Sequence, residues 1–307
     1  MVKKISNIVF TKNRPLQLDG YLTSLYRFFP TEAIQTYILY KEELFSDSYE
    51  KLFAKFPDCI VVREKNFHKD FMDILNSIDT KYILFGVDDV IYFDSVDLAI
   101  IDKCFDDFSN DIFGFSLRFN KRTIGQGQDK LAEYDIANQK VYSLNWQNGK
   151  SPATSYPFEL CATVYLTELV KDIIQNQMNS CPLCKKMFTP GSCFVETLGR
   201  VLSKRKLLKS FGYFFSPNTL ESWNCRWCKN NPSKVPISLY FQKNCAVAIQ
   251  INMVNTSTIN EIESLAEHTV EALDEKYKQG YEMDVNFVIE NKPEDTHSKQ
   301  ELFKLSK

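Results

Sequence analysis

The sequence predicts an α/β fold with a mostly parallel sheet and helices on both of its faces. Three observations support this prediction. The 307 residues are 44% hydrophobic and 25% charged, which is typical of a globular chain. Strand-like and helix-like segments alternate through the first third of the chain, as they do in β-α-β units. The apolar run 81–87 is too short for a helix and has the length of a buried strand.

The first-half elements follow one another closely. We expect strands at 5–11, 36–40, 59–63 and 81–87, and helices after Pro15, at 49–56 and at 67–78. Pro15 favours a helix start because its fixed φ suits the first turn, and Leu18, Leu22 and Leu25 recur at helical spacing. In such sheets ligands bind beyond the carboxyl ends of the strands.

The second half alternates less regularly. Strands are expected at 111–119, 140–144, 159–165 and within 238–254, and helices at 167–176, 192–209 and 259–279. The helix at 259–279 has acids near its start and Gly280 as its stop. Residues 285–289 are predicted to form a last strand, and the polar residues after it a loose tail.

Composition excludes some classes of function. Lys and Arg total 37 against 39 Asp and Glu, and a net charge of −2 argues against a nucleic-acid partner. No run approaches the ~20 apolar residues of a membrane span. Nine cysteines without a secretory signal indicate reduced thiols and a cytoplasmic location. The basic run 204–206 suggests at most a peripheral membrane contact, and a solvated helix face explains it more simply.

Two adjacent carboxylates, Asp88 and Asp89, follow the strand at 81–87. Unpaired carboxylates at the end of a buried strand repel each other and are costly to desolvate. Mg²⁺ or Mn²⁺ would resolve this conflict, since such a cation takes one or two carboxylates and completes its shell with water and substrate phosphates. A solvated turn in which one Asp caps the next segment is the alternative.

Residues Ile8-Val9-Phe10-Thr11-Lys12-Asn13-Arg14-Pro15 resemble the opening strand and turn of GT-A-fold glycosyltransferases. Residues 84–93 resemble the metal-binding aspartate motif of that fold, although the usual Asp-any-Asp spacing is here Asp88-Asp89-Val90. Residues 113–118 and 156–159 are similar to segments of bacterial family-2-like transferases. The resemblance covers roughly residues 4–240. Its departure from the usual spacing leaves open which Asp contacts the metal.

The resemblance implies a GT-A-type, Rossmann-like fold and a metal-dependent, hexosyltransferase-type glycosyltransferase. This enzyme would move a sugar from a UDP- or GDP-type nucleotide-sugar donor to a hydroxyl of a glycan or glycolipid acceptor. We expect such an enzyme to act in polysaccharide biosynthesis. The resemblance implies a catalytic domain with a nucleotide-binding half at 1–110 and an acceptor half at 111–240. A C-terminal strand-helix-strand extension at 241–290 and a flexible tail at 291–307 would follow.

The resemblance also implies roles for individual residues. The nucleotide-sugar would be bound by Phe10, Thr11, Arg14, Asp88 and Arg118, and the Mn²⁺ or Mg²⁺ by Asp89 with Asp88. Arg14 suits the donor because a guanidinium is always charged and can fork onto a phosphate. A surface arginine is the alternative for that residue.

An inverting transfer needs a base near the acceptor hydroxyl. Glu196 is the candidate because it lies late in the core and near an expected helix start, with Glu159 and Glu221 in reserve. Compensation of the helix dipole would also explain a carboxylate at that place. A retaining enzyme needs no such base, so the stereochemistry stays open.

The cysteines form two C-x-x-C pairs, Cys181 with Cys184 and Cys225 with Cys228. Four thiolates could hold a structural Zn²⁺ that staples an insertion in the acceptor half, with Cys193 as a substitute ligand. The gap between the pairs is longer than the usual ~15–20 residues, but the cost of closing a loop grows slowly with its length. Free thiols are the alternative.

Four aromatic residues in polar surroundings are candidate sugar platforms, with core packing as the alternative for each. They are Trp146, Tyr156, Trp223 and Trp227.

Two rival functions remain open. A nucleotidyltransferase on a related α/β core usually has a glycine-rich phosphate loop after its first strand, whereas the first glycine here is Gly20. A zinc-stabilised interaction protein with a GT-A-like shell would have no activity.

Overall fold

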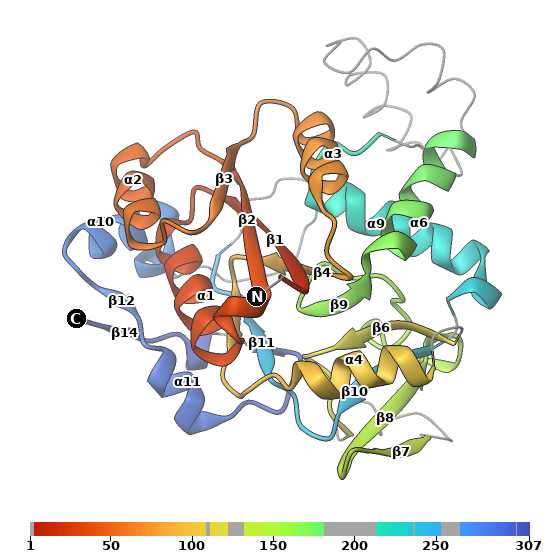
Figure 1. The fold of residues 1–307 in the computed structure, drawn as a ribbon. Helices are drawn as coiled ribbons and strands as arrows, with labels where there is room; N and C mark the ends of the chain where they lie inside the picture. Colours follow the sequence, from red (N-terminus) through yellow and green to blue (C-terminus); the bar gives the residue numbers. More distant parts are fainter. Residues whose placement is uncertain are drawn as a thin grey trace.

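The computed structural model describes residues 3–108, 111–121, 132–180, 213–235, 237–252, 265–298 and 300–307. Within these residues the main sheet has nine strands in the order β3-β2-β1-β4-β9-β6-β10-β8-β7 (Figure 1). Strands β8 and β9 run against the others, so the sheet is mixed but mostly parallel. The strands are β1 (Ile5–Lys12), β2 (Ile34–Lys41), β3 (Ile60–Arg63), β4 (Tyr82–Val87), β6 (Ile112–Ser116), β7 (Glu133–Ile136), β8 (Gln139–Asn145), β9 (Thr163–Leu166) and β10 (Ile237–Phe241).

The first half alternates as the sequence predicts. Strands β1 to β4 are separated by α1 (Pro15–Phe28), the 3-10 turn η1 (Thr31–Ala33), α2 (Ser46–Lys55) and α3 (Phe67–Ser77). Strand β1 is buried on both faces: Ile5 and Val9 belong to one hydrophobic cluster, and Ile8 and Phe10 to the other. A strand buried in this way must be covered by helices on both sides.

Helices do cover both faces, which confirms the predicted fold class (Figure 1). One hydrophobic cluster includes residues of α1, α4 (Leu98–Asp107), α10 (Val270–Lys278) and α11 (Val285–Asn291). The other includes residues of α3, α6 (Thr167–Ser180) and α9 (Pro217–Asn230). Short 3-10 segments complete the described chain: η2 (Trp146–Asn148), η3 (Pro232–Lys234), η4 (Ala266–His268) and η5 (Gln300–Leu302).

Two short strands join the C-terminal part of the chain to the first half. Strand β5 (Val90–Tyr92), directly after the two aspartates, pairs antiparallel with β11 (Ala246–Ile249). Strand β13 (His297–Ser298) pairs with β11 in turn. Residues beyond 240 therefore pack onto the segment that follows β4.

The predicted last strand at 285–289 is wrong, because these residues form helix α11. Asp284 caps the helix by accepting a hydrogen bond from the Phe287 backbone N–H. Val285 and Val288 lie one helical turn apart and are both buried. Tertiary packing thus overrides the β propensity of this valine-rich segment.

The helix predicted at 259–279 is shorter than expected. It begins at Val270, where Thr269 caps it, and residues 266–268 form a 3-10 turn. Residues 253–264 lie outside the described part of the chain, as do residues 192–209 of another predicted helix. The predicted strand at 159–165 begins only at Thr163.

The expected loose tail is also wrong for the described C-terminal residues. Strand β14 (Leu305–Ser306) pairs with β12 (Glu282–Met283), and Leu302 is buried in the cluster that contains α1. The segment is mostly polar, but a few apolar residues such as Leu302 pack into the core and hold it in place.

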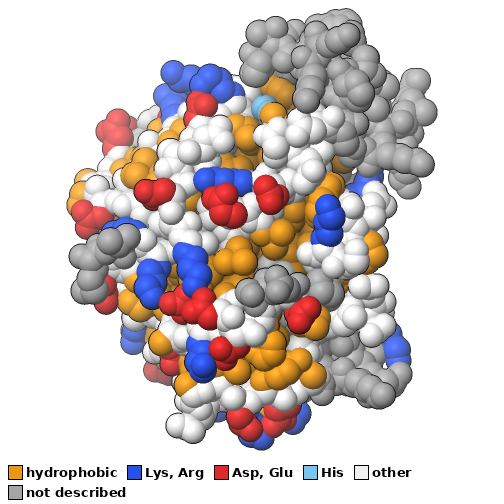
Figure 2. All heavy atoms as spheres, turned by 45° about the vertical axis from the view of Figure 1, so that its right-hand side comes forward, with side chains coloured by type: hydrophobic (Ala, Val, Ile, Leu, Met, Phe, Trp, Pro, Cys, Tyr) orange, Lys and Arg blue, Asp and Glu red, His pale blue; other side chains and the backbone are white. Residues whose placement is uncertain are grey.

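Figure 2 shows one face of the molecule, on which cationic and anionic side chains are intermixed. None of the helices in the described part of the chain has the length and apolarity that a membrane span requires.

The C-terminal anchor yields a stability prediction. Leu302→Ala should lower the free energy of unfolding by about 2–4 kcal/mol, because it leaves a cavity in the core. The same substitution at Leu44, which is 46% exposed, is the control and should have little effect. Denaturant unfolding measures both, and equal losses would show that the tail is not packed as described.

Candidate active site at the carboxyl end of the sheet

The site begins where β1 and β4 end side by side. Phe10 is opposite Val87 in the parallel register, so the residues that follow each strand meet at one edge of the sheet. Asn13 turns the chain there with a φ of 52°, a conformation that asparagine tolerates. Its Oδ1 accepts hydrogen bonds from the backbone N–H groups of Glu43 and Leu44.

Asp88 is buried, and both of its carboxylate oxygens are occupied. Arg14 Nη1 donates to Oδ1 at 2.9 Å, and Thr11 Oγ1 donates to Oδ2 at 2.7 Å. Arg14 is itself only 8% exposed, and its Nη2 donates to the backbone carbonyl of Asn252. Arg14 therefore compensates the charge of Asp88 within the protein, and its predicted contact with a donor phosphate stays a prediction.

Asp89 differs from its neighbour. Its Oδ1 is buried and has no hydrogen-bond partner among the described residues. The pKa of this carboxyl is raised to about 6, mainly by desolvation; the Arg14 charge opposes the rise, the Asp88 charge adds to it, and the Arg118 charge also opposes it. Of the two aspartates, Asp89 is thus the one with an oxygen available for a cation.

The described residues contain no group of three or more His, Cys, Asp or Glu side chains that could enclose a metal ion. A divalent cation at Asp89 would take its other ligands from water and substrate phosphates, a pattern that is usual for Mg²⁺. The residues present fit such an ion through one carboxylate.

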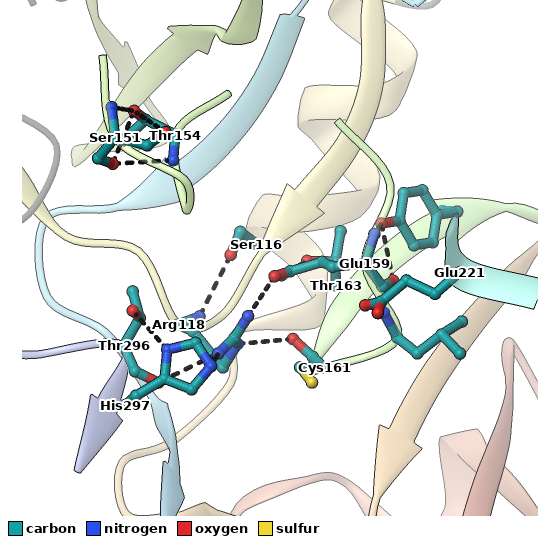
Figure 3. Close-up of polar contacts among 12 residues, drawn as sticks. Ser116, Arg118, Ser151, Thr154, Glu159, Cys161, Thr163, Glu221, Thr296 and His297 are labelled. Atoms are coloured by element: carbon teal, nitrogen blue, oxygen red, sulfur yellow. Dashed lines mark hydrogen bonds and ion pairs between the residues drawn. The ribbon is translucent and has the colours of Figure 1, made fainter. Parts of the chain in front are cut away.

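Arg118 follows β6 and forms the centre of a second polar group (Figure 3). The guanidinium is 4% exposed, and all of its nitrogens donate to protein atoms. Nε donates to the Cys161 carbonyl at 2.9 Å, Nη1 to the Thr296 carbonyl at 3.1 Å, and Nη2 to the Glu159 carboxylate. As for Arg14, the predicted donor contact of Arg118 stays a prediction.

Glu159, a reserve candidate for the base, accepts hydrogen bonds from neighbouring side chains at both of its carboxylate oxygens. Arg118 donates to its Oε2, and Thr163 Oγ1 donates to its Oε1. Its backbone N–H donates to the Tyr165 hydroxyl at 3.0 Å. Neither carboxylate oxygen is left open, so the arrangement favours a structural role for Glu159.

Glu221, the other reserve candidate, has a carboxyl group with a raised pKa. It lies in the second turn of α9, and its Oε1 accepts a hydrogen bond from the Leu160 backbone N–H at 3.0 Å (Figure 3). The pKa of Glu221 is raised to about 7, mainly by desolvation; the hydrogen bond from Leu160 and the Arg118 charge oppose the rise, and the nearby Glu159 charge adds to it. A carboxyl that titrates near neutrality suits proton transfer at physiological pH.

Several predicted residues lie outside the described part of the chain: Glu196, Cys181, Cys184 and Cys193. Cys225 and Cys228 are described as free thiols, buried on α9 in the cluster that contains α3 and α6. Burial raises the pKa of Cys225 to about 11. The structural zinc stays a prediction, because only one of the two pairs can be placed.

Two of the four candidate sugar platforms are core residues. Trp146 and Trp223 are 7% and 5% exposed and pack in the same cluster as Cys225. Trp146 Nε1 also donates to the Val235 carbonyl. Tyr156 and Trp227 are half-buried at the edge of that cluster, so a sugar contact by either one stays a prediction.

The C-terminal contributors to the site could not be predicted from the sequence. Asn252 contacts Arg14, and Thr296 and His297 contact Arg118, from positions more than a hundred residues away along the chain. These residues lie in polar segments without a motif. Only the folded topology brings them to the carboxyl end of the sheet.

Comparison with known proteins relates the chain to glycosyltransferases. No family model matches it. The chain is 23% identical over 192 residues to the bifunctional glycosyltransferase pgtA of Dictyostelium discoideum, and the match covers 54% of this chain and 24% of that protein. The chain thus spans about a quarter of the length of this curated relative. The match confirms the resemblance to glycosyltransferases that the sequence motifs predict.

Solved structures give weaker similarities. TarS of S. aureus has a TM-score of 0.40 at 17% identity, covering 55% of this chain and 29% of its own. A TarS fragment in complex with UDP-GlcNAc scores 0.39 at 18% identity, covering 55% of this chain and 47% of its own. A Pyrobaculum calidifontis mannosyltransferase in complex with GDP-Man and Mn²⁺ has a TM-score of 0.32 at 13% identity, covering 40% of this chain and 37% of its own. At these TM-scores the similarities carry no further conclusion.

The Arg14–Asp88 pair yields a prediction about the two aspartates. Asp88→Asn should lower the free energy of unfolding by about 3–5 kcal/mol, because it leaves the Arg14 charge buried without its partner. Asp89→Asn should leave stability at pH 7.5 unchanged or raise it, because the Asp89 carboxylate is disfavoured by burial. Denaturant unfolding at that pH compares them, and similar losses for both would contradict the assigned roles.

Glu221 yields a prediction about pH. Its folded-state pKa of about 7 lies above the value of roughly 4.3 expected in the unfolded chain. Its ionisation therefore lowers the stability of the fold progressively as the pH rises from the lower to the higher value, and the loss stays constant above that. The difference in Tm, Glu221→Gln minus the natural protein, should therefore increase from pH 5 to pH 7.5 and then level off. Glu168→Gln, at a side chain that is 86% exposed, is the control and should show no such trend. Parallel Tm curves for Glu221→Gln and the natural protein would refute the assignment.

Proposed function

We propose that this chain catalyses metal-dependent glycosyl transfer from a UDP- or GDP-type nucleotide-sugar to a hydroxyl of a glycan or glycolipid acceptor. One observation carries the proposal: at the carboxyl end of β4, Asp88 is neutralised by Arg14, while a buried oxygen of Asp89 has no partner among the residues that the structure describes. Such a carboxylate on the ligand side of a mostly parallel sheet suits a cation with bound phosphates. The sequence similarity to a glycosyltransferase supports the same reading.

Asp89 would hold Mn²⁺ or Mg²⁺ on the donor diphosphate. When bound, the cation would neutralise the charge that develops on the departing nucleoside diphosphate. Asp88, fixed by Arg14 and Thr11, would keep the turn and hence Asp89 in place. Thr11 and Phe10, at the end of β1, would then border the nucleotide.

Glu221 would act as the base. It would take the proton of the acceptor hydroxyl while the acceptor oxygen attacks the anomeric carbon and the bond from that carbon to the diphosphate breaks. This single displacement inverts the anomeric centre. Among the described carboxylates near Arg118, Glu221 is preferred over Glu159, because both oxygens of Glu159 already accept hydrogen bonds.

The acceptor, a role in polysaccharide biosynthesis and a cytoplasmic location with at most peripheral membrane contact remain proposals from the sequence. The bound nucleotides named for the solved neighbours, UDP-GlcNAc and GDP-Man, suggest the first donors to test.

Donor hydrolysis tests the proposal without requiring the true acceptor. The natural protein should hydrolyse at least one of UDP-GlcNAc, UDP-Glc and GDP-Man, and do so only with Mn²⁺ or Mg²⁺. Asp89→Asn should slow this reaction about a hundredfold or more, because several kcal/mol of charge stabilisation is lost.

Asp135→Asn provides a matched control, since Asp135 is exposed on β7. It should retain full activity. Metal-independent turnover, or an Asp89→Asn variant as active as this control, would rule out the proposed role of Asp89.

A further inference from the structure

The C-terminal segment 293–298 lies across the end of β6, where Arg118 is located. Asn244 Nδ2 donates to the Pro293 carbonyl at 3.0 Å, and the Ala248 and Gln250 backbone N–H groups donate to residues 296 and 298. Strand β13 is thereby held in register on β11. The segment is a packed element with fixed partners and not a loose extension.

Two groups of this segment bind Arg118 directly (Figure 3). The Thr296 carbonyl accepts a hydrogen bond from Arg118 Nη1 at 3.1 Å. The same nitrogen lies 3.3 Å from His297 Nε2. Both groups lie on the opposite side of the guanidinium from Glu159, which Nη2 contacts.

Hydrogen-bond chemistry fixes the tautomer of His297. A guanidinium has only donors, so Nε2 must accept the hydrogen bond and carry no proton. The proton of the neutral ring is then on Nδ1, which donates to Thr296 Oγ1 at 3.1 Å. His297 is exposed as a residue, but desolvation of its ring and the adjacent Arg118 charge lower its pKa to about 4, which keeps the ring neutral at physiological pH.

The orientation of Arg118 matters because its charge acts on the acceptor side of the site. Its guanidinium pairs with Glu159 and interacts electrostatically with Glu221. A guanidinium is planar with its donors in a rigid fork, so binding one edge sets the direction of the other. The groups that bind Nη1, the Thr296 carbonyl and His297 Nε2, therefore also set the direction in which the guanidinium charge faces the two glutamates.

We propose that His297 is a positioning residue of the transfer site: its Nε2 holds Arg118 in the orientation in which the guanidinium engages Glu159 and faces Glu221. The proposal makes the C-terminal strand part of the site. Its catalytic consequence rests on the proposed glycosyl transfer, whereas the restraint on Arg118 does not.

The restraint is tested by NMR on the ¹⁵N-labelled full chain. The measured quantity is the exchange with solvent of the Arg118 Nη–H protons, one of which is bonded to His297 Nε2, assigned by their loss in Arg118→Lys. His297→Leu removes the acceptor and should accelerate this exchange about tenfold, as expected for a lost hydrogen bond to a charged group. His297→Gln places an amide oxygen near Nε2 and should restore exchange to within about twofold of the natural protein.

Asp295→Asn is the control for changes elsewhere in the segment, because Asp295 is exposed and two residues from His297. It should leave the exchange unchanged. Unaltered exchange in His297→Leu, or acceleration that His297→Gln does not reverse, would overturn the proposal.

A kinetic measurement tests the catalytic consequence. With a donor that the natural protein hydrolyses, His297→Leu should lower kcat about tenfold and leave KM for the nucleotide-sugar within about twofold, with kcat restored in His297→Gln. Equal rates in all three proteins would remove the catalytic role. If the natural protein turns over no donor, the proposed function fails, and the exchange measurement still decides whether His297 positions Arg118.

Discussion

Two adjacent carboxylates at the end of a buried strand set the main constraint on this molecule. Like charges this close cannot both remain buried and uncompensated. The structure resolves the conflict for Asp88, which Arg14 and Thr11 satisfy. It leaves Asp89 with a buried oxygen that has no partner in the described chain. The remaining features of the site follow from this asymmetry, because a satisfied aspartate fixes the turn and an unsatisfied one favours a cation.

The same principle of internal pairing organises the polar group around Arg118. Arg118 joins segments that are distant in sequence: the end of β6, the loop before β9 and the C-terminal strand. Its pairing with Glu159 occupies one carboxylate, while desolvation raises the pKa of the other, Glu221, to about 7. Two glutamates only a short distance apart thereby acquire different chemistry, and burial and partners set the difference.

The sequence predicted the parts that depend on local patterns. The alternation of β1 to β4 with α1 to α3, and the aspartates after β4, follow from periodicity and from strand ends. The helix at 285–291 could not be predicted in this way, because its valines favour a strand and only packing selects the helix. The choice between Glu159 and Glu221 also required the fold, since the partners of each come from other segments. No local pattern marked Asn252, Thr296 or His297.

The most direct test of the central claim is Mn²⁺ binding in the presence of a nucleoside diphosphate, followed by electron paramagnetic resonance. The asymmetry between the aspartates predicts that the natural protein binds Mn²⁺ with UDP or GDP and that Asp89→Asn loses this binding. A folded Asp88→Asn variant should bind Mn²⁺ more weakly but not lose it, because Asp88 positions Asp89 while its own oxygens are already occupied. Retention of Mn²⁺ in Asp89→Asn together with its loss in Asp88→Asn would contradict the account.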